Sequence, residues 1–298
     1  MTFFYFCQMK VEIDIGAGPC FGVLKATEMA EGFLSHNKSL LCIGDLIHNE
    51  EEMKRLNKLG LKTSTLQSAI DNKHQKVLFR AHGETPKSYL LAKNNNVQII
   101  DATCPIVAKL QKQIANTYQK IKTKKEQILI YGNKRHPEII SLQGFCNGEA
   151  HIIESITDLN RIDFTIPIHL FSQTTKYRSY YLLIKEEIIK KQHNIAGKKS
   201  LSFHNSSCKI VAQRDLQLQD FIRNKDLIIF VSGKKSSNGK QLFDLCQKSS
   251  IPSYFISNIQ EISLLWFKQK TNIGISGATS TPLWLLKKIK AYIETING

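Results

Sequence analysis

The chain has 298 residues, of which 42% are hydrophobic, and it carries a formal net charge of +16 at pH 7. This length and composition predict a globular protein with a sizeable core, as either two domains of ordinary size or three small ones. No apolar run approaches the roughly 18 to 20 residues that span a bilayer, which argues against a transmembrane protein. The opening MTFFYFCQMK lacks the basic start and small-residue cleavage site of a signal peptide, so we expect a cytoplasmic protein.

The positive charge suggests an anionic partner, such as nucleic acid, a membrane surface or a phosphorylated substrate. The lysines are scattered along the chain, however, and basic groups such as KTKKEQ are typical of solvated helix faces. No stripe of Lys and Arg interleaved with aromatic residues occurs. We therefore expect a small-molecule partner, with no nucleic acid and no membrane.

Six short apolar runs follow one another, and each ends in small or polar residues, as buried strands that open into functional loops do. In chain order they are SLLCIGDLIHN from Ser39, KVLFRAHGE from Lys76, QILIYGNKRHPE from Gln127, IPIHLFSQTT from Ile166, LIIFVSGKKSSN from Leu227 and TNIGISGATSTP from Thr271. Helical patterns such as LQKQIANTYQKI and YYLLIKEEIIKK lie between them. The alternation predicts an α/β fold with mostly parallel strands.

One short pattern occurs three times, as CFGVLKA at Cys20, CPIVAKL at Cys104 and CKIVAQR at Cys208. Each copy has the character of a helix start, and strand-like VEIDIG, QIIDAT and KKSLSFHNSS precede the three cysteines in turn. Two of the six strand runs follow each cysteine before the next copy or the end of the chain. We therefore predict three similar small α/β lobes around a pseudo-threefold axis. Their expected residues are 21–103, 104–204, and 205–298 with 1–20, and residues 193–200 (HNIAGKKS) are the most linker-like stretch.

Three cysteines at helix N-termini are candidate metal ligands, because the helix dipole favours the thiolate that binds metal. Three thiolates from distant points fit either zinc with an open fourth position or a 4Fe-4S cluster with one unligated iron. No close C-x2-C pair occurs, which favours the cluster. The seven cysteines are an odd number, which argues against a disulfide framework. We expect the remaining four to be structural thiols: Cys7, Cys42, Cys146 and Cys246.

The expected strand ends carry side chains suited to phosphate oxygens, namely imidazoles, hydroxyls and amides. They are His48, Asn49, His82, His136, Thr174, Thr175, Ser236, Ser237, Asn238 and Ser280. Six such loops facing one cavity could wrap a diphosphate. Glu138 is the one carboxylate among these loop tips, and both a proton donor for a leaving hydroxyl and a surface ion pair remain open for it.

The ordered set CFGV, LIHN, AHG, DATCP, HPE, QTT, SSN and ATSTP resembles the 4-hydroxy-3-methylbut-2-enyl diphosphate reductases of the non-mevalonate (MEP) isoprenoid pathway, over almost the whole chain. The resemblance implies a three-lobed monomeric iron-sulfur oxidoreductase with one 4Fe-4S cluster, whose free apical iron binds the substrate's C4 hydroxyl. Two-electron reductive dehydroxylation would give isopentenyl and dimethylallyl diphosphate. A reduced ferredoxin or flavodoxin would supply the electrons, which suits a basic chain.

The resemblance also implies roles for individual residues. The cluster ligands would be Cys20, Cys104 and Cys208. Glu138 matches the proton donor, with Thr174 beside the substrate hydroxyl and His136 in the same catalytic group. The diphosphate ligands would be His48, His82, His136, Ser236, Ser237, Asn238 and Ser280.

Three residues depart from the family's pattern, namely Pro19 before the first cysteine, and Val211 and Asp215 after the third. They bear on the hydrogen bonds around the cluster more than on its ligands. Two alternatives to the reductase remain. One is an enzyme similar to the quinolinate synthases, which would be expected to use more Arg for its dicarboxylate substrates. The other is a basic nucleic-acid-binding protein with structural zinc.

Overall fold

The structure is a computed structural model that describes residues 9–193, 195 and 200–296. Cys7 and most of the linker-like stretch at 193–200 lie outside these residues. The chain divides into two compact units. The first contains the segment up to Leu24, Ile47–Leu59 and the segment from Ile210, and the second contains Lys25–Leu46 and Gly60–Lys209.

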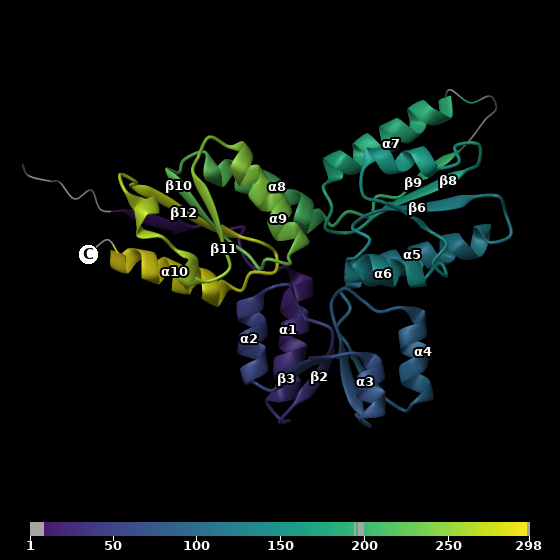
Figure 1. Cartoon of the computed structure of the whole chain (residues 1–298), viewed down its shortest axis with the longest axis horizontal. Helices are drawn as coiled ribbons and strands as arrows, with labels where there is room; N and C mark the ends of the chain where they lie inside the picture. The colour runs from purple at the N-terminus through teal and green to yellow at the C-terminus, as the bar shows by residue number, and fades with distance from the viewer. Residues whose placement is uncertain (1–8, 194, 196–199, 297–298) are drawn as a thin grey trace, which may run out of the picture. The chain divides into compact units, whose positions relative to one another are not determined.

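The strands of the described residues form three four-stranded sheets in which all neighbouring strands are parallel (Figure 1). Sheet A has the order β1-β12-β10-β11, sheet B β3-β2-β4-β5 and sheet C β7-β6-β8-β9. If β1 is counted as the last strand of sheet A, each sheet has the strand order 2-1-3-4 along the chain. The predicted α/β class and its three repeated lobes are confirmed.

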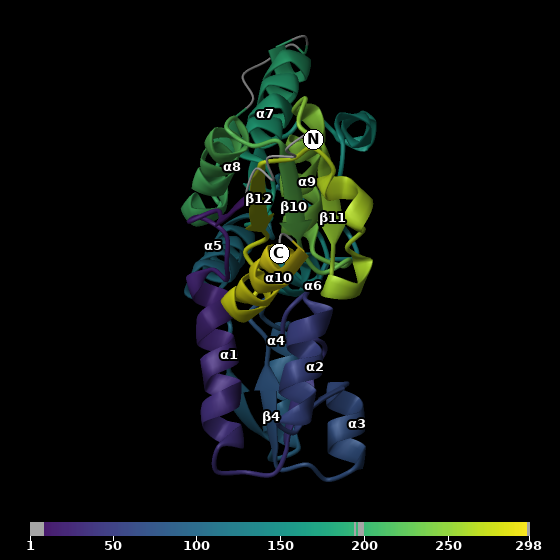
Figure 2. The same ribbon diagram turned by 90° about the vertical axis from the view of Figure 1, so that its left-hand side faces the viewer.

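Sheet A belongs to the first unit and contains β1 (Lys10–Ile13), β10 (Leu227–Val231), β11 (Ser253–Ile256) and β12 (Asn272–Gly277). Figure 2 shows β12, β10 and β11 side by side in this order. β1 pairs with β12, so the strand before Cys20 completes the last sheet, as the sequence predicts. The helical elements of this unit are α2 (Glu50–Lys58), α8 (Lys209–Ile222), α9 (Ser237–Lys248), η2 (Ile259–Glu261), η3 (Leu264–Phe267) and α10 (Leu283–Ile296).

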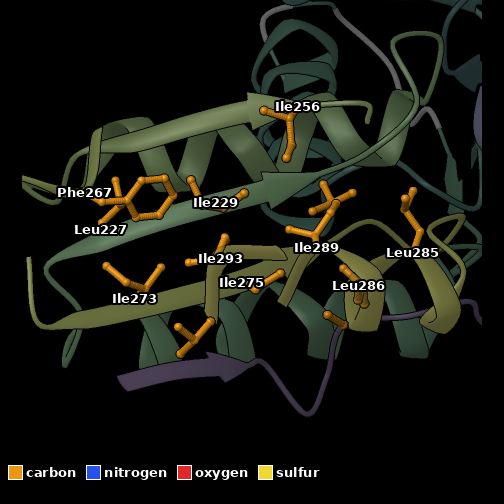
Figure 3. Packing of buried hydrophobic residues seen from close by; sticks show 13 residues of the cluster. Leu227, Ile229, Ile256, Phe267, Ile273, Ile275, Leu285, Leu286, Ile289 and Ile293 are labelled. Carbon is orange, nitrogen blue, oxygen red and sulfur yellow. The ribbon is translucent and has the colours of Figure 1, made fainter. Parts of the chain in front are cut away.

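The central strands of sheet A are buried on both faces, because helices cover each side. Leu227 and Ile229 pack with Leu286 and Ile289 of α10 (Figure 3). The alternate residues of β10 pack instead with α8 and α9 on the opposite face. Each fully buried Leu or Ile stabilises the fold by roughly 1.5–3 kcal/mol, so these apolar runs hold the sheet and fix where its polar loops begin.

Sheet C belongs to the second unit and contains β6 (Gln127–Tyr131), β7 (His151–Ile153), β8 (Ile168–Ser172) and β9 (Leu201–Phe203). The helices α5 (Pro105–Ile121) and α6 (Pro137–Gly144) pack on one face, and η1 (Ile156–Arg161) and α7 (Arg178–His193) pack on the other. Both α5 and α6 begin with proline, whose fixed φ suits the first helical position. The helical patterns predicted in α5 and α7 are confirmed.

Sheet B, also in the second unit, contains β2 (Leu40–Ile43), β3 (Leu61–Ser64), β4 (Lys76–Phe79) and β5 (Gln98–Asp101). Its helices α3 (Leu66–Asp71) and α4 (Pro86–Asn94) pack on one face. Helix α1 (Phe21–Leu34) begins in the first unit and continues in the second. No helix in the described ranges is both long and apolar enough to cross a membrane.

The strands of sheet B lie within 21–103, those of sheet C within 104–204, and those of sheet A within 205–298 and 1–20. The lobe boundaries themselves stay a prediction. The second strand of each sheet, β3, β7 or β11, has no counterpart among the strands expected from the sequence.

Candidate functional site

The three repeated cysteines occupy equivalent positions in the three sheets. Each follows the fourth strand of its sheet and immediately precedes a helix, α1, α5 or α8. Each also donates its backbone N–H to a carbonyl oxygen in the loop after the third strand of the same sheet. These bonds are Cys20 to Thr279, Cys104 to Ala81 and Cys208 to Thr174, each 3.0 Å long. The repeat in the sequence therefore corresponds to a repeat in structure.

Burial sets the chemistry of the other three described cysteines. Cys42, Cys146 and Cys246 are fully buried, and burial raises the pKa of all three, to about 12 for Cys42 and Cys246. They remain thiols, whereas metal binding requires the thiolate. The side chain of Cys104 lies at the start of α5 and makes no capping hydrogen bond to the helix. The expectation of structural thiols fits these three, and Cys7 lies outside the described residues.

The predicted diphosphate-binding and catalytic residues all lie after the first or third strand of a sheet, either in the loop or in the first turn of the helix that follows. In a sheet of order 2-1-3-4 these two loops flank the point where the strand order reverses, which is where open α/β sheets bind ligands. The residues are His48 after β2, His82 after β4, His136 and Glu138 after β6, Thr174 after β8, Ser236, Ser237 and Asn238 after β10, and Ser280 after β12.

In the first unit, hydrogen bonds join three of these loops. Ser236 caps α9, and its Oγ accepts the backbone N–H of Gly239 at 3.0 Å. The hydroxyl of Ser280 lies 3.2 Å from the Ser236 hydroxyl and 3.4 Å from the carbonyl oxygen of His48. Ser237 is the first residue of α9. A helix N-terminus with adjoining hydroxyls is suited to binding an anion.

Asn238 is held in a single orientation by a residue that the sequence analysis does not name. Its Oδ1 accepts the backbone N–H of Thr279 at 3.0 Å and the Thr279 hydroxyl at 2.9 Å. The side chain is 5% exposed, and its Nδ2 has no hydrogen-bond partner among the described residues. A buried amide donor without a protein partner fits a ligand that offers oxygen acceptors. Thr279 lies in the quoted ATSTP motif, which could have indicated it.

The His48 loop is fixed against the rest of the first unit. A β-carbon at Gly233 would lie 2.2 Å from the His48 carbonyl oxygen, so only glycine permits this approach. The next residue, Asn49, caps α2 through a 3.0 Å bond from the backbone N–H of Glu52. The Glu52 carboxylate in turn accepts the indole N–H of Trp284 at 2.5 Å.

In the second unit, His82 and His136 lie together, with ring centroids 5.1 Å apart in an edge-to-face arrangement. His136 caps α6, and its Nδ1 accepts the backbone N–H of Glu138 at 3.1 Å. The neutral ring therefore carries its proton on Nε2, where it can donate to a ligand.

The residue after His82, Gly83, packs closely on a hydrogen-bond network that joins α5 and α6. Gln111 donates to the Ser141 hydroxyl at 2.7 Å, and Ser141 donates to the Glu84 carbonyl oxygen at 3.1 Å.

Glu138 is 1% exposed, so it forms no surface ion pair, and that alternative from the sequence analysis is wrong. Its Oε1 accepts the backbone N–H of Thr174 at 2.7 Å, and its Oε2 accepts the Thr174 hydroxyl at 2.8 Å. Burial raises the pKa of Glu138 to about 7, while the bonds from Thr174 oppose this shift. Near neutral pH the carboxyl group is thus poised to give up a proton.

Two of the departures from the family's pattern lie in α8. Val211 is buried and offers no side-chain hydrogen bond one turn after Cys208. Asp215 is partly buried, and burial raises its pKa to about 6. Pro19 has no backbone N–H, so it cannot donate a hydrogen bond next to Cys20.

The chain is similar throughout to one family of proteins. The model of the LytB protein family matches residues 11–294. The 4-hydroxy-3-methylbut-2-enyl diphosphate reductase of Bacteroides thetaiotaomicron is 44% identical, with 97% of this chain and 99% of the relative covered. The enzyme of the same name from Parabacteroides distasonis is 42% identical, with 98% and 99% covered.

Two solved structures share the fold. The E-1-hydroxy-2-methyl-but-2-enyl-4-diphosphate reductase of Plasmodium falciparum superposes with a TM-score of 0.84 at 24% identity, covering 96% of this chain and 87% of that one. A second structure, of an (E)-4-hydroxy-3-methyl-but-2-enyl diphosphate reductase described as the terminal enzyme of the non-mevalonate pathway, has a TM-score of 0.69 at 26% identity, covering 96% and 99%.

Proposed function

Since the chain belongs to the LytB family, we propose that it reduces 4-hydroxy-3-methylbut-2-enyl diphosphate to isopentenyl and dimethylallyl diphosphate. The substrate takes up two electrons and two protons, its C4–O bond breaks, and the hydroxyl leaves as water. The buried Glu138, bonded through both oxygens to Thr174, is the observation that supports this chemistry most directly, because the leaving hydroxyl needs a proton donor. The relatives' names support neither a quinolinate synthase nor a nucleic-acid-binding protein.

We infer that the cofactor is a 4Fe-4S cluster held by Cys20, Cys104 and Cys208. The donor set fits, because three cysteines at equivalent helix starts leave one iron without a protein ligand, while burial keeps Cys42, Cys146 and Cys246 as thiols. When bound, the cluster would supply the electrons and a Lewis-acidic iron without a protein ligand.

The residues of the chain would bind the diphosphate and deliver the proton. His48, His82, His136, Ser236, Ser237, Asn238 and Ser280 would donate hydrogen bonds to its oxygens. When Glu138 is protonated, its carboxyl group would donate to Oγ1 of Thr174 across the same contact, and the Thr174 hydroxyl would turn and pass its own proton to the C4 hydroxyl oxygen. The bond that Nδ1 of His136 accepts from the Glu138 backbone N–H would keep the ring proton of the neutral imidazole on Nε2.

A reduced ferredoxin or flavodoxin would supply the electrons, and acidic proteins of this kind suit a chain with a net charge of +16. We propose that the chain acts as a monomer of three lobes in the cytoplasm, where thiols stay reduced.

The test is iron and sulfide content, with Mössbauer spectra recorded with and without substrate on protein prepared without oxygen, followed by turnover. A four-iron cluster with one distinct iron whose signal moves on adding substrate, together with product formation, is the expected result. Cys104→Ala should lose the cluster, and Cys246→Ala, which removes a buried thiol, should keep it. Zinc, or no metal after reconstitution, would contradict the proposal.

A further inference from the structure

The first unit contains a buried ion pair that the proposed reaction does not use. Arg214 of α8 and Asp14 at the end of β1 are 3% and 2% exposed. The Arg214 Nη2 donates to Oδ2 of Asp14 and also to the hydroxyl of Ser276, at 2.6 Å for the latter. Ser276 in turn donates to the same Asp14 oxygen at 2.9 Å. These bonds join β1, β12 and α8.

The second oxygen of Asp14 shapes the turn that leads to Cys20. Its Oδ1 accepts the backbone N–H of Gly16 at 2.9 Å, and its carbonyl oxygen accepts the backbone N–H of Ala17 at 2.9 Å. One carboxylate therefore folds the turn with one oxygen and binds α8 through Arg214 with the other.

The turn also lies directly against α8. A β-carbon at Gly16 would lie 2.9 Å from Nη1 of Arg214 and 2.6 Å from Oε1 of Gln217. The close approach brings the backbone of the turn against the buried guanidinium, which a larger residue at this position would have to displace. After the turn, the backbone N–H of Cys20 donates to Thr279. Arg214 thus supports one side of the segment that carries Cys20.

Stability alone does not account for this pair. Removing two charges from water is costly, and apolar residues of similar volume often stabilise a core as well or better. Nε and Nη1 of Arg214 have no hydrogen-bond partner among the described residues, which adds to this cost. What an apolar pair would not supply is directional bonding that fixes one position of the turn on the helix.

The pair also has a particular place along the chain. Asp14 precedes Cys20 by six residues, and Arg214 follows Cys208 by six, in the helix that begins directly after that cysteine. We propose that Asp14 and Arg214 are positioning residues that fix the Cys20 turn on α8, so that Cys20 is preorganised as a metal ligand. This rests on the proposed function, in which Cys20 and Cys208 bind the same cluster.

The test measures how fast each cysteine of the full-length chain is alkylated by iodoacetamide after the metal is removed with a chelator. Cys20 is partly exposed, so its rate in Arg214→Met should rise severalfold, up to about tenfold, since a charge-assisted bond to a buried carboxylate shifts a local opening equilibrium by about that factor. Cys246, buried in the same unit, and Cys104 should keep their wild-type rates. Asp14→Asn should behave like Arg214→Met, and Arg214→Lys, which keeps a charged donor, should restore part of the protection.

Lys225→Met is the matched control, because Lys225 forms another ion pair to β1, with Glu12, two residues before Asp14. It should leave the Cys20 rate unchanged. In the loaded enzyme, Arg214→Met should release iron to a chelator several-fold faster than Lys225→Met does. An unchanged Cys20 rate in Arg214→Met, or equal rises at Cys20 and Cys246, would overturn the inference. If wild-type protein holds no cluster, the proposed function fails, while the alkylation rates still decide whether the pair fixes the turn.

Discussion

Thr174 binds both carboxylate oxygens of Glu138, with its backbone N–H on Oε1 and its hydroxyl on Oε2. These bonds join the loop after β8 to the start of α6, across the point where the strand order of sheet C reverses. A carboxyl group buried to this degree ionises reluctantly, and only the bonds from Thr174 offset the effect of burial. The same geometry fixes the acid and gives its proton a route through a hydroxyl.

Glu138→Gln should therefore keep the cluster and lose turnover. Glutamine has nearly the same shape and still accepts from the Thr174 N–H, but it carries no acidic proton. Turnover should fall by about a hundredfold or more, as expected for removal of a general acid. Iron content and steady-state rates on the same preparation decide the outcome, and near-normal activity would refute the proposed role.

Glu138 should also make stability depend on pH. Its pKa is about 7 in the folded chain, against an ordinary value of 4.5, so between these two pH values the folded state binds more protons than the unfolded state. The contribution of Glu138 to the free energy of unfolding should be fully present below about pH 4.5. It should fall by about 3 kcal/mol as the pH rises through 7. Glu138→Gln cannot ionise and should lack this slope. Denaturant titrations of both metal-free chains from pH 4.5 to 8 measure the difference, and parallel curves would contradict the assignment.

Thr174→Val separates the two bonds to Glu138. Valine deletes the hydroxyl but keeps the backbone N–H, so one of the bonds that lower the pKa of Glu138 is lost. Turnover should fall about tenfold or more because the relay is broken, and the alkaline limb of the rate profile should move to higher pH. Thr175→Val is the control, since that hydroxyl accepts from Gln173 at 3.0 Å and does not contact Glu138. Identical pH profiles for the two variants would argue against the relay.

Much of the fold could be predicted because the central strands are apolar runs that end at polar loops. The missed strands β3, β7 and β11 have the sequences LKTS, HII and SYFI, and each lies at a sheet edge. An edge strand of three or four residues is held by one neighbour and needs no long apolar run, so periodicity does not reveal it. The order 2-1-3-4 likewise depends on pairings between distant segments.

The residues of the candidate site likewise include some that the sequence indicates and others that only the fold reveals. His136 and Asn238 could be named because suitable polar residues recur after all six apolar runs, a coincidence that the sequence alone shows. The Asp14–Arg214 pair carries no local signal, since its two members lie 200 residues apart. Thr279 lies in the ATSTP motif, but its contact with Asn238, 41 residues away, appears only in the fold. The same limit applies to Glu138, because its burial, which decides between an acid and a surface ion pair, comes from packing of the whole lobe.

Asn238→Asp tests the diphosphate proposal with little change of shape. An aspartate oxygen can still accept both bonds from Thr279, but the donor Nδ2 is replaced by a negatively charged oxygen that repels a diphosphate. KM should rise about 10- to 100-fold, because a lost donor at a buried site costs about 1–3 kcal/mol, while iron content stays unchanged. Asn258→Asp provides the control, since Asn258 caps η2 in the same unit through its Oδ1, a role that Asp also fills. If both variants leave KM unchanged, Asn238 does not bind the diphosphate, and its unpaired amide needs another explanation.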